Sequence, residues 1–209
     1  MGFFSKLLGL GEGTKKIKWI NQYVKNRNVL DIGCCGEGEM AYLKDNWVHG
    51  HIKSVASNCT GLDLNEKEIN RLAFLGYNVI VGNAQDFNLT NSFDVVVAAD
   101  ILEHLEDMKG FFVSVDRVLN EDGYLIITTP NPWFLLIIFN CIFKGYAYVN
   151  PDHVTWFCAS TIRELLLRYG YTIEKLDYGS SESILYHVGF FRPILFHTSI
   201  FIAAKKKRN

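Results

Sequence analysis

Residues 28–38, NVLDIGCCGEG, decide the fold, because a short apolar run ends at Asp31 and a glycine-rich loop follows at once. An apolar run without polar alternation is typical of a strand that is buried on both faces of a parallel sheet. Gly33, Gly36 and Gly38 let backbone amides approach a ligand, because glycine has no Cβ. The stretch therefore predicts either a ligand-binding loop after the first strand of an α/β sheet or an ordinary strand-to-helix turn.

Further strands and helices alternate in the first two thirds of the chain. Asn65 with Glu68 predicts the start of a helix that ends at Gly76, and residues 108–119 keep a helical period before a turn at 120–123. Four more apolar runs predict strands at 60–64 (TGLDL), 78–81 (NVIV), 93–99 (FDVVVAA) and 124–129 (YLIITT). This alternation predicts a doubly wound, mostly parallel α/β sheet.

The last third changes character after Pro130. The apolar segment 132–145, PWFLLIIFNCIFKG, is shorter than a membrane span needs, and its length fits a buried or an interfacial helix. Thr161 and Glu164 have the T-x-x-E spacing of a capping box. Two more strands are predicted at 171–177 and 198–204. The sheet then has seven strands, with an apolar insertion after the fifth.

Composition narrows the class of protein. The chain has 209 residues, 49% of them hydrophobic, and 21 basic against 22 acidic side chains, so a disordered chain is excluded and nothing suggests a nucleic-acid partner. Five cysteines without a CxxC pair, and no recognisable signal peptide, predict a reduced, cytoplasmic chain. Of the 29 aromatic residues, 16 lie within 131–209, which marks the last third as different.

Polar residues follow the predicted strands, where doubly wound sheets bind ligands. Asp63 follows the second strand and can accept the hydroxyls of a ribose, or it can interact with the positive end of the next helix. After the third strand, Asn83, Ala84 and Gln85 border an adenine edge or form a polar turn.

After the fourth strand, Asp100, Glu103 and His104 cluster, either as site residues or as the start of the next helix. The loop 33–38 reads G-x-x-G-x-G, which departs from the G-x-G-x-x-G of nicotinamide-binding folds. A nicotinamide oxidoreductase is therefore disfavoured.

Five motifs in order carry a family resemblance. They are VLDIGC (29–34), GLDLN (61–65), NAQDF (83–87), FDVVVAADILEHL (93–105) and DGYLIITTPNP (122–132). Together they resemble the class I S-adenosylmethionine-dependent methyltransferases, in particular small-molecule enzymes of the type 11/12 groups. The resemblance covers residues 27–130 most strongly, and it implies a Rossmann-like fold with S-adenosylmethionine as cofactor.

The resemblance also implies roles for single residues. It places Asp31 and Gly33 by the methionine part of the cofactor, Asp63 at the ribose, and Asp100 near the sulfonium. The residues expected to contact the cofactor are Asp31, Gly33, Cys34, Gly36, Asp63, Leu64, Asn83, Ala84, Gln85, Ala99 and Asp100.

Two features depart from the family pattern. Cys35 stands where the family's usual loop has its second glycine. The distance from Asp31 to Asp63 is 32 residues, about ten more than the roughly 20 of a simple nucleotide-binding unit. We expect an excursion over 38–50 and then a helix around 51–57.

The chain is expected to form one domain over 1–209. Its parts are an N-terminal helical segment (1–26), a cofactor-binding core (27–130), a lid that contacts the acceptor (131–159), and a C-terminal helix with strands (160–209).

Methyl transfer needs mainly positioning and exclusion of water, so no metal is expected. For a hydroxyl acceptor, which we favour, the candidate general bases are His104 and His153, although His153 can equally be a loop histidine packed beside Trp156. A methyltransferase-like binding or scaffold protein without turnover is the alternative.

The aromatic residues of the last third predict where a hydrophobic small-molecule or lipid-linked acceptor binds. They are Trp133, Phe134, Phe139, Phe143, Tyr146 and Tyr148, and a satellite core or a homodimer surface is the competing interpretation. The basic residues 205–208 predict a solvated tail, with weak attraction to an anionic membrane.

Overall fold

Strand β1 (Asn28–Ile32) lies inside a seven-stranded sheet with the order β3-β2-β1-β4-β5-β7-β6. The computed structural model describes residues 13–147, 149–179 and 193–207. The other strands are β2 (Asn58–Asp63), β3 (Val79–Val81), β4 (Phe93–Ala99), β5 (Leu119–Pro130), β6 (Tyr171–Gly179) and β7 (Ser199–Lys206). Within this sheet β7 runs antiparallel to both of its neighbours, and the other strand pairs are parallel. The predicted seven-stranded, mostly parallel sheet is confirmed.

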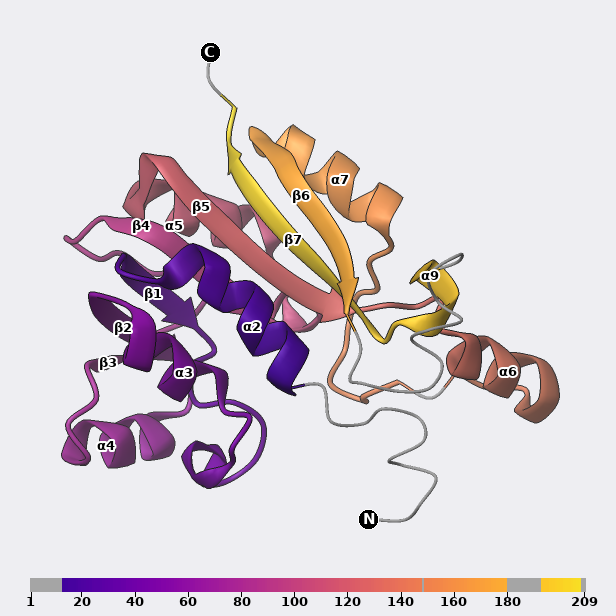
Figure 1. Ribbon diagram of the computed structural model, residues 1–209, viewed down its shortest axis with the longest axis horizontal. Coiled ribbons are helices and arrows are strands. Elements are labelled where there is room, and N and C mark those ends of the chain that lie inside the picture. The colour runs from indigo at the N-terminus through magenta and orange to yellow at the C-terminus, as the bar shows by residue number, and fades with distance from the viewer. Residues whose placement is uncertain (1–12, 148, 180–192, 208–209) are drawn as a thin grey trace.

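Helices cover both faces of the sheet (Figure 1). On one face α2 (Gly13–Val24) and α3 (Val48–Val55) pack on Val29, Val95 and Val97. On the other, α5 (Met108–Val118) and α7 (Ala159–Arg168) pack on a core that includes Leu30 and Val96. Successive residues of β1 thus point into opposite cores, which explains why the central strands lack polar alternation.

Strand β5 is longer than predicted. The turn expected at 120–123 belongs to β5, which begins at Leu119, directly after α5. The register with β4 shifts there, since Phe93 pairs with Leu119 but Val95 pairs with Tyr124. The extra residues form an irregularity in the strand, so the polar sequence NEDG did not end it.

The helix predicted from Asn65 is confirmed as α4 (Glu66–Phe74), where the Asn65 side chain accepts the N–H of Glu68 at 3.2 Å. The helix expected around 51–57 lies earlier, at Val48–Val55, because His49 and Ile52 form its buried face. The short 3₁₀ turns η1 (Ala41–Leu43) and η2 (Leu102–His104) precede α3 and α5.

The prediction of a capping box at Thr161 and Glu164 was wrong. Helix α7 begins after Cys158, and the Cys158 N–H donates to Thr161 Oγ1 at 3.0 Å. Thr161 therefore lies at the third position of the helix, while Glu164 pairs with Arg168 at 2.9 Å. A capping box with the same three-residue spacing does exist one turn earlier, between Cys158 and Thr161, and its N-cap group is the Cys158 thiol.

Helix α6 (Leu135–Lys144) follows β5 and lies at the end of the molecule, with the short α9 (Pro193–Phe196) also there (Figure 1). None of its side chains is buried, so a core position for this segment was the wrong alternative. Among the described residues, no helix has the length and apolarity that crossing a membrane requires.

The basic residues 205–208 were predicted to form a solvated tail, and the structure agrees only in part, because two of them belong to a strand. Lys205 and Lys206 extend β7, and Lys206 pairs with Asp116 at 3.1 Å and with Glu121 at 3.6 Å. The strand continues past the predicted residue 204 because β6 offers partners as far as Tyr171. Residues 208, 148 and 1–12, which enter other predictions, lie outside the described residues.

Candidate functional site

A cavity of about 890 Å³ opens at the carboxyl ends of β1, β2, β4 and β5. Its volume is within the range of small-molecule and cofactor sites. Nine of the predicted site residues line it, namely Asp31, Gly33, Cys34, Gly36, Asp63, Ala99, Asp100, His104 and His153. These residues come from four separate segments of the chain. Three of them meet because parallel strands end at one edge of the sheet, and the fourth, with His153, is the loop between α6 and α7.

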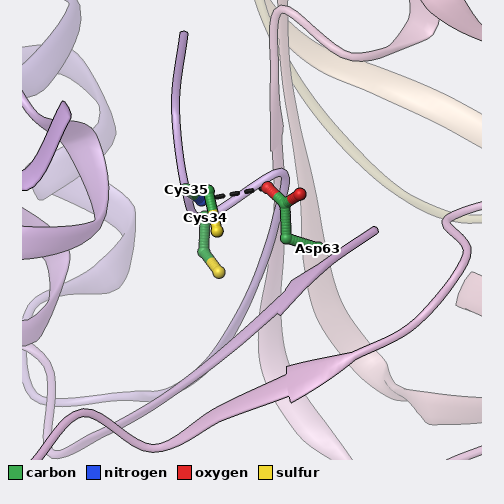
Figure 2. A group of neighbouring side chains, drawn as sticks. All are labelled: Cys34, Cys35 and Asp63. Atoms are coloured by element: carbon green, nitrogen blue, oxygen red, sulfur yellow. Dashed lines mark hydrogen bonds between the residues drawn. The ribbon is translucent and has the colours of Figure 1, made fainter. Parts of the chain in front are cut away.

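The cysteine-containing loop is attached to the end of β2. The Cys35 N–H donates to Asp63 Oδ2 at 3.0 Å, a bond drawn in Figure 2. The Asn65 N–H donates to Asp63 Oδ1 at 2.9 Å. An ionised carboxylate has about four acceptor positions, so Asp63 can still accept from a ligand in the cavity. Although Cys35 stands at a glycine position of the family loop, its backbone N–H therefore still forms a hydrogen bond that holds the loop to β2.

Asp31 is buried at the end of β1, and its Oδ2 lies 2.9 Å from Nδ1 of His49 on α3. Burial raises the pKa of Asp31, while the hydrogen bond and charge of His49 oppose that change. His49 also lines the cavity. The long segment between Asp31 and Asp63 therefore contributes the side chain of His49 to the site.

Asp100 has a left-handed backbone conformation, with φ of 55°, directly after β4. A non-glycine residue there is strained by about 1–2 kcal/mol, which surrounding contacts must offset. Lys16 of α2 forms an ion pair with Asp100 Oδ2, and Thr128 Oγ1 donates to Oδ1 at 2.8 Å. Burial alone would raise the pKa of Asp100, but Lys16 and Thr128 lower it overall. The carboxylate is thus held in its charged form.

Glu103 is a second buried carboxyl group in the cavity, 1% exposed. Thr129 Oγ1 donates to its Oε2 at 3.2 Å, and its Oε1 has no partner among the described residues. Burial, with the negative charge of Asp100 nearby, raises the pKa of Glu103 to about 8. At neutral pH Glu103 therefore retains its proton and can donate a hydrogen bond to a ligand.

We predict that the Glu103→Gln variant gains stability relative to wild type as the pH rises. The pKa of Glu103 is 4.5 in a free side chain and about 8 in the folded chain. Between these pH values only the folded state holds the proton, so wild type loses up to about 1.4 kcal/mol per pH unit, a loss that glutamine avoids. Urea unfolding of both proteins from pH 4 to 9 measures the difference. An equal pH dependence in the two proteins would contradict the assignment.

His104 and His153 lie next to each other, with ring centroids 4.6 Å apart and the rings nearly perpendicular. His104 Nδ1 lies 3.1 Å from the carbonyl oxygen of Asp152, so Nδ1 is the donor, and in the neutral imidazole Nε2 is the acceptor. Burial, and then the nearby His104, lower the pKa of His153. The backbone of Glu103 also joins the two segments, because the Val154 N–H donates to its carbonyl at 2.9 Å.

Four predicted residues lie outside the lining of this cavity: Leu64, Asn83, Ala84 and Gln85. The Leu64 side chain is 66% exposed after β2. Asn83 Oδ1 accepts the Gln85 N–H at 2.9 Å, and Gln85 Oε1 accepts the N–H of Asp107 at the start of α5. In the described structure these polar groups form a turn and connect it to α5.

Within the described part of the chain, two groups of three side chains bring possible metal-ligand atoms within 4.8 Å of one another: Cys34, Cys35 and Asp63, and Glu103, His104 and His153. In the first, a hydrogen bond with Cys35, and then burial, raise the pKa of the Cys34 thiol, so the thiolate that a metal needs is disfavoured. We assign no metal to either group.

Sequence reasoning missed Lys16 and His49 as site residues. Lys16 comes from α2, far from any strand end in the sequence, and no local pattern indicated it. His49 lies in the excursion 38–50, where polar residues between two strands are ordinary in a loop. Its only signal was the unusual length of the segment between Asp31 and Asp63.

A smaller cavity of about 130 Å³ adjoins the large one, and the two share Pro130, Asn150 and His153. Its apolar lining includes Ile137, Val149 and Trp156, and none of the described aromatic residues that were predicted to form an acceptor wall. Phe134 is buried, while Trp133, Phe139, Phe143 and Tyr146 are exposed on and around α6. The aromatic acceptor wall therefore stays a prediction, because its described members lie outside the linings of both cavities.

Comparison with known proteins gives a family match. The methyltransferase domain family matches residues 14–176. A Mycolicibacterium smegmatis protein named probable S-adenosylmethionine-dependent methyltransferase is 33% identical over 152 residues, which cover 71% of this chain and 53% of that protein. The ubiquinone biosynthesis O-methyltransferase of Proteus mirabilis is 24% identical, over 78% of this chain and 73% of its own. The chain spans about half the length of several curated relatives it matches.

Solved structures share the fold. An S-adenosylmethionine-dependent methyltransferase from Archaeoglobus fulgidus superimposes with a TM-score of 0.64 at 22% identity, covering 98% of each chain. The magnesium protoporphyrin IX methyltransferase of Synechocystis, solved with bound S-adenosylhomocysteine, has a TM-score of 0.65 at 15% identity, covering 99% of this chain and 89% of that one. These likenesses concern the fold.

Proposed function

This chain belongs to the methyltransferase domain family, within the class I S-adenosylmethionine-dependent methyltransferases, and from that membership we propose its reaction. The reaction is methyl transfer from S-adenosylmethionine to a hydroxyl of a hydrophobic small-molecule or lipid-linked acceptor. The observation behind this proposal is that one cavity holds seven of the eleven residues expected at the cofactor, together with a histidine whose second ring nitrogen is unused.

The cavity fits the cofactor in volume and in chemistry. Asp63 offers carboxylate oxygens at the end of β2, where ribose hydroxyls are bound in nucleotide-binding sheets. Gly33 presents a surface without a Cβ, because Ile101 leaves no room for one. Bound S-adenosylmethionine supplies an electrophilic methyl group on a sulfonium, which needs no covalent or metal assistance. Asp100, held charged by Lys16, adds negative potential near the place expected for that cation.

His104 is the proposed general base. Its Nδ1 donates to the Asp152 carbonyl, so Nε2 can accept the proton of an acceptor hydroxyl as the methyl group is transferred. Named relatives include both O-directed and N-directed enzymes, for example a phosphoethanolamine N-methyltransferase of Caenorhabditis elegans. We favour oxygen because a neutral amine has a free lone pair and needs no base.

A hydrophobic acceptor is supported by the apolar cavity beside the histidines and by α6. The smaller cavity places Ile137 and Trp156 next to His153. Helix α6 exposes Leu135, Phe139 and Phe143, and its one charged residue is Lys144. Such a face suits a lipid-linked acceptor or the surface of a membrane. Membrane contact, a homodimer and a cytoplasmic location remain predictions.

The first test is calorimetry of the protein with S-adenosylmethionine and S-adenosylhomocysteine. The second mixes the protein and S-adenosylmethionine with hydrophobic phenols and lipid-linked alcohols, and uses mass spectrometry to detect the gain of one methylene unit. No binding at millimolar cofactor would refute the proposal. Binding with no methylated product from any acceptor class would favour a binding or scaffold protein.

With a methylated acceptor in hand, we predict that His104→Ala lowers kcat by about 100-fold or more, since loss of a general base costs that much. Binding of S-adenosylhomocysteine should stay within about threefold of wild type, because His104 is outside the residues expected at the cofactor. Steady-state kinetics and calorimetry measure the two effects. The His51→Ala variant is the matched control, because it removes a histidine of α3 that does not line the cavity. A kcat equal to wild type would eliminate His104 as the base.

A further inference from the structure

A buried hydrogen bond joins the end of β1 to helix α3. His49 Nδ1 and Asp31 Oδ2 are 2.9 Å apart, and the side chains are 0% and 4% exposed. An ionised carboxylate can only accept, so Nδ1 carries the proton of this bond. A carboxylate removed from water in this way needs a partner to remain charged.

The imidazole ring is held by its neighbours. The rings of Trp47 and Tyr77 lie 5.3 and 5.9 Å from it, centroid to centroid. A Cβ added to Gly61 on β2 would lie 2.8 Å from His49 Cε1, so the strand leaves space for the ring. The orientation of His49 is therefore set by packing, and Asp31 is aligned against a fixed donor.

Both residues also line the large cavity. Among the described residues, His49 is the one side chain that donates a hydrogen bond to the Asp31 carboxylate. The small exposed part of Asp31 thus faces the cavity where the resemblance implies the methionine part of the cofactor. A pair that served the core alone would not need to lie on the wall of a ligand cavity.

We propose that His49 is a positioning residue for the cofactor. Its Nδ1–H keeps the Asp31 carboxylate ionised and directed into the cavity, where that carboxylate binds the cationic amino group of S-adenosylmethionine. The inference rests on the proposed function, since it assumes that this cofactor binds here.

The surroundings of Asp31 support this role. The titratable groups that face it are His49 from α3, Cys34 from the loop, and Cys59 and Asp63 from β2. Burial raises the pKa of Asp31, Asp63 raises it further, and His49 lowers it. Without His49 the carboxyl group should take up a proton at a higher pH, and the bond to a cationic ligand should be lost with it.

The experiment measures S-adenosylhomocysteine binding by calorimetry from pH 5 to 9 in wild type and four variants. His49→Gln and His49→Leu both remove the donor at Nδ1, so either one that folds is sufficient. His49→Asn keeps a donor close to that place, because its amide nitrogen can occupy the position of Nδ1. His51→Gln, on the same helix but bonded to the Asp45 carbonyl, is the matched control.

We expect the Gln and Leu variants to bind about 10- to 100-fold more weakly at pH 7, the loss typical of a hydrogen bond to a charged group. The pH at which binding weakens in acid should also move upward. The Asn and His51 variants should remain close to wild type.

Unchanged affinity and an unchanged acid limb in the Gln or Leu variant would overturn the inference. An Asn variant as weak as the Gln variant would also overturn it, because the ring would then act by packing. If wild type itself does not bind S-adenosylhomocysteine, the proposed function fails instead.

Discussion

The Asp63→Ala variant is expected to bind S-adenosylhomocysteine about 100-fold more weakly than wild type. Its carboxylate lies at the end of β2 in the large cavity and can accept hydrogen bonds from two ribose hydroxyls. Loss of two bonds to a charged acceptor costs about 3 kcal/mol. Isothermal titration calorimetry at constant pH and salt measures the change in dissociation constant.

Two controls separate binding from folding. Asp63 also accepts the N–H groups of Cys35 and Asn65, so its removal can loosen the loop. The Asp63→Asn variant keeps one carbonyl acceptor and should lose less affinity than the alanine variant. Asp86→Ala, an exposed carboxylate after β3, should leave the affinity unchanged. Wild-type affinity in Asp63→Ala would show that the ribose is not held at β2.

The Gly33→Ala variant is expected to melt about 10 °C below wild type. Gly33 has φ of 81°, and a Cβ there would lie 2.1 Å from Ile101 Cδ1. The left-handed backbone costs about 1–2 kcal/mol with a side chain, and forcing Ile101 aside adds about 1–3 kcal/mol. In a chain of this size each kcal/mol lowers the melting temperature by about 2–4 °C.

Gly76→Ala is the matched control for Gly33→Ala. Gly76 has the same φ of 81° but no atom within 4 Å of an added Cβ, so its variant should show the backbone cost alone. Adding Ile101→Val to Gly33→Ala removes Cδ1 and should recover part of the loss, despite a cost of its own. Circular dichroism melts measure all four proteins. Equal losses in the two glycine variants would show that the contact with Ile101 does not matter.

The strand pattern of this protein could be read locally, and most of it was predicted. Apolar runs such as residues 28–32 and 93–99 are buried on both faces, so hydrophobicity alone marks them. The errors fall where tertiary contacts override local pattern. Strand β5 continues through NEDG because β4 lies beside it, and α3 begins early because His49 packs against β2.

By itself the sequence determined the order of strands and helices, and it identified Asp31, Asp63, Asp100 and His104 at strand ends, because these signals depend on neighbouring residues. Only the tertiary structure decided which groups share a cavity and which partners set their charge. Lys16 reaches Asp100 from a helix 84 residues away, and His49 returns to Asp31 across 18 residues. Such contacts depend on the paths of chain segments through space, and no local sequence pattern specifies those paths.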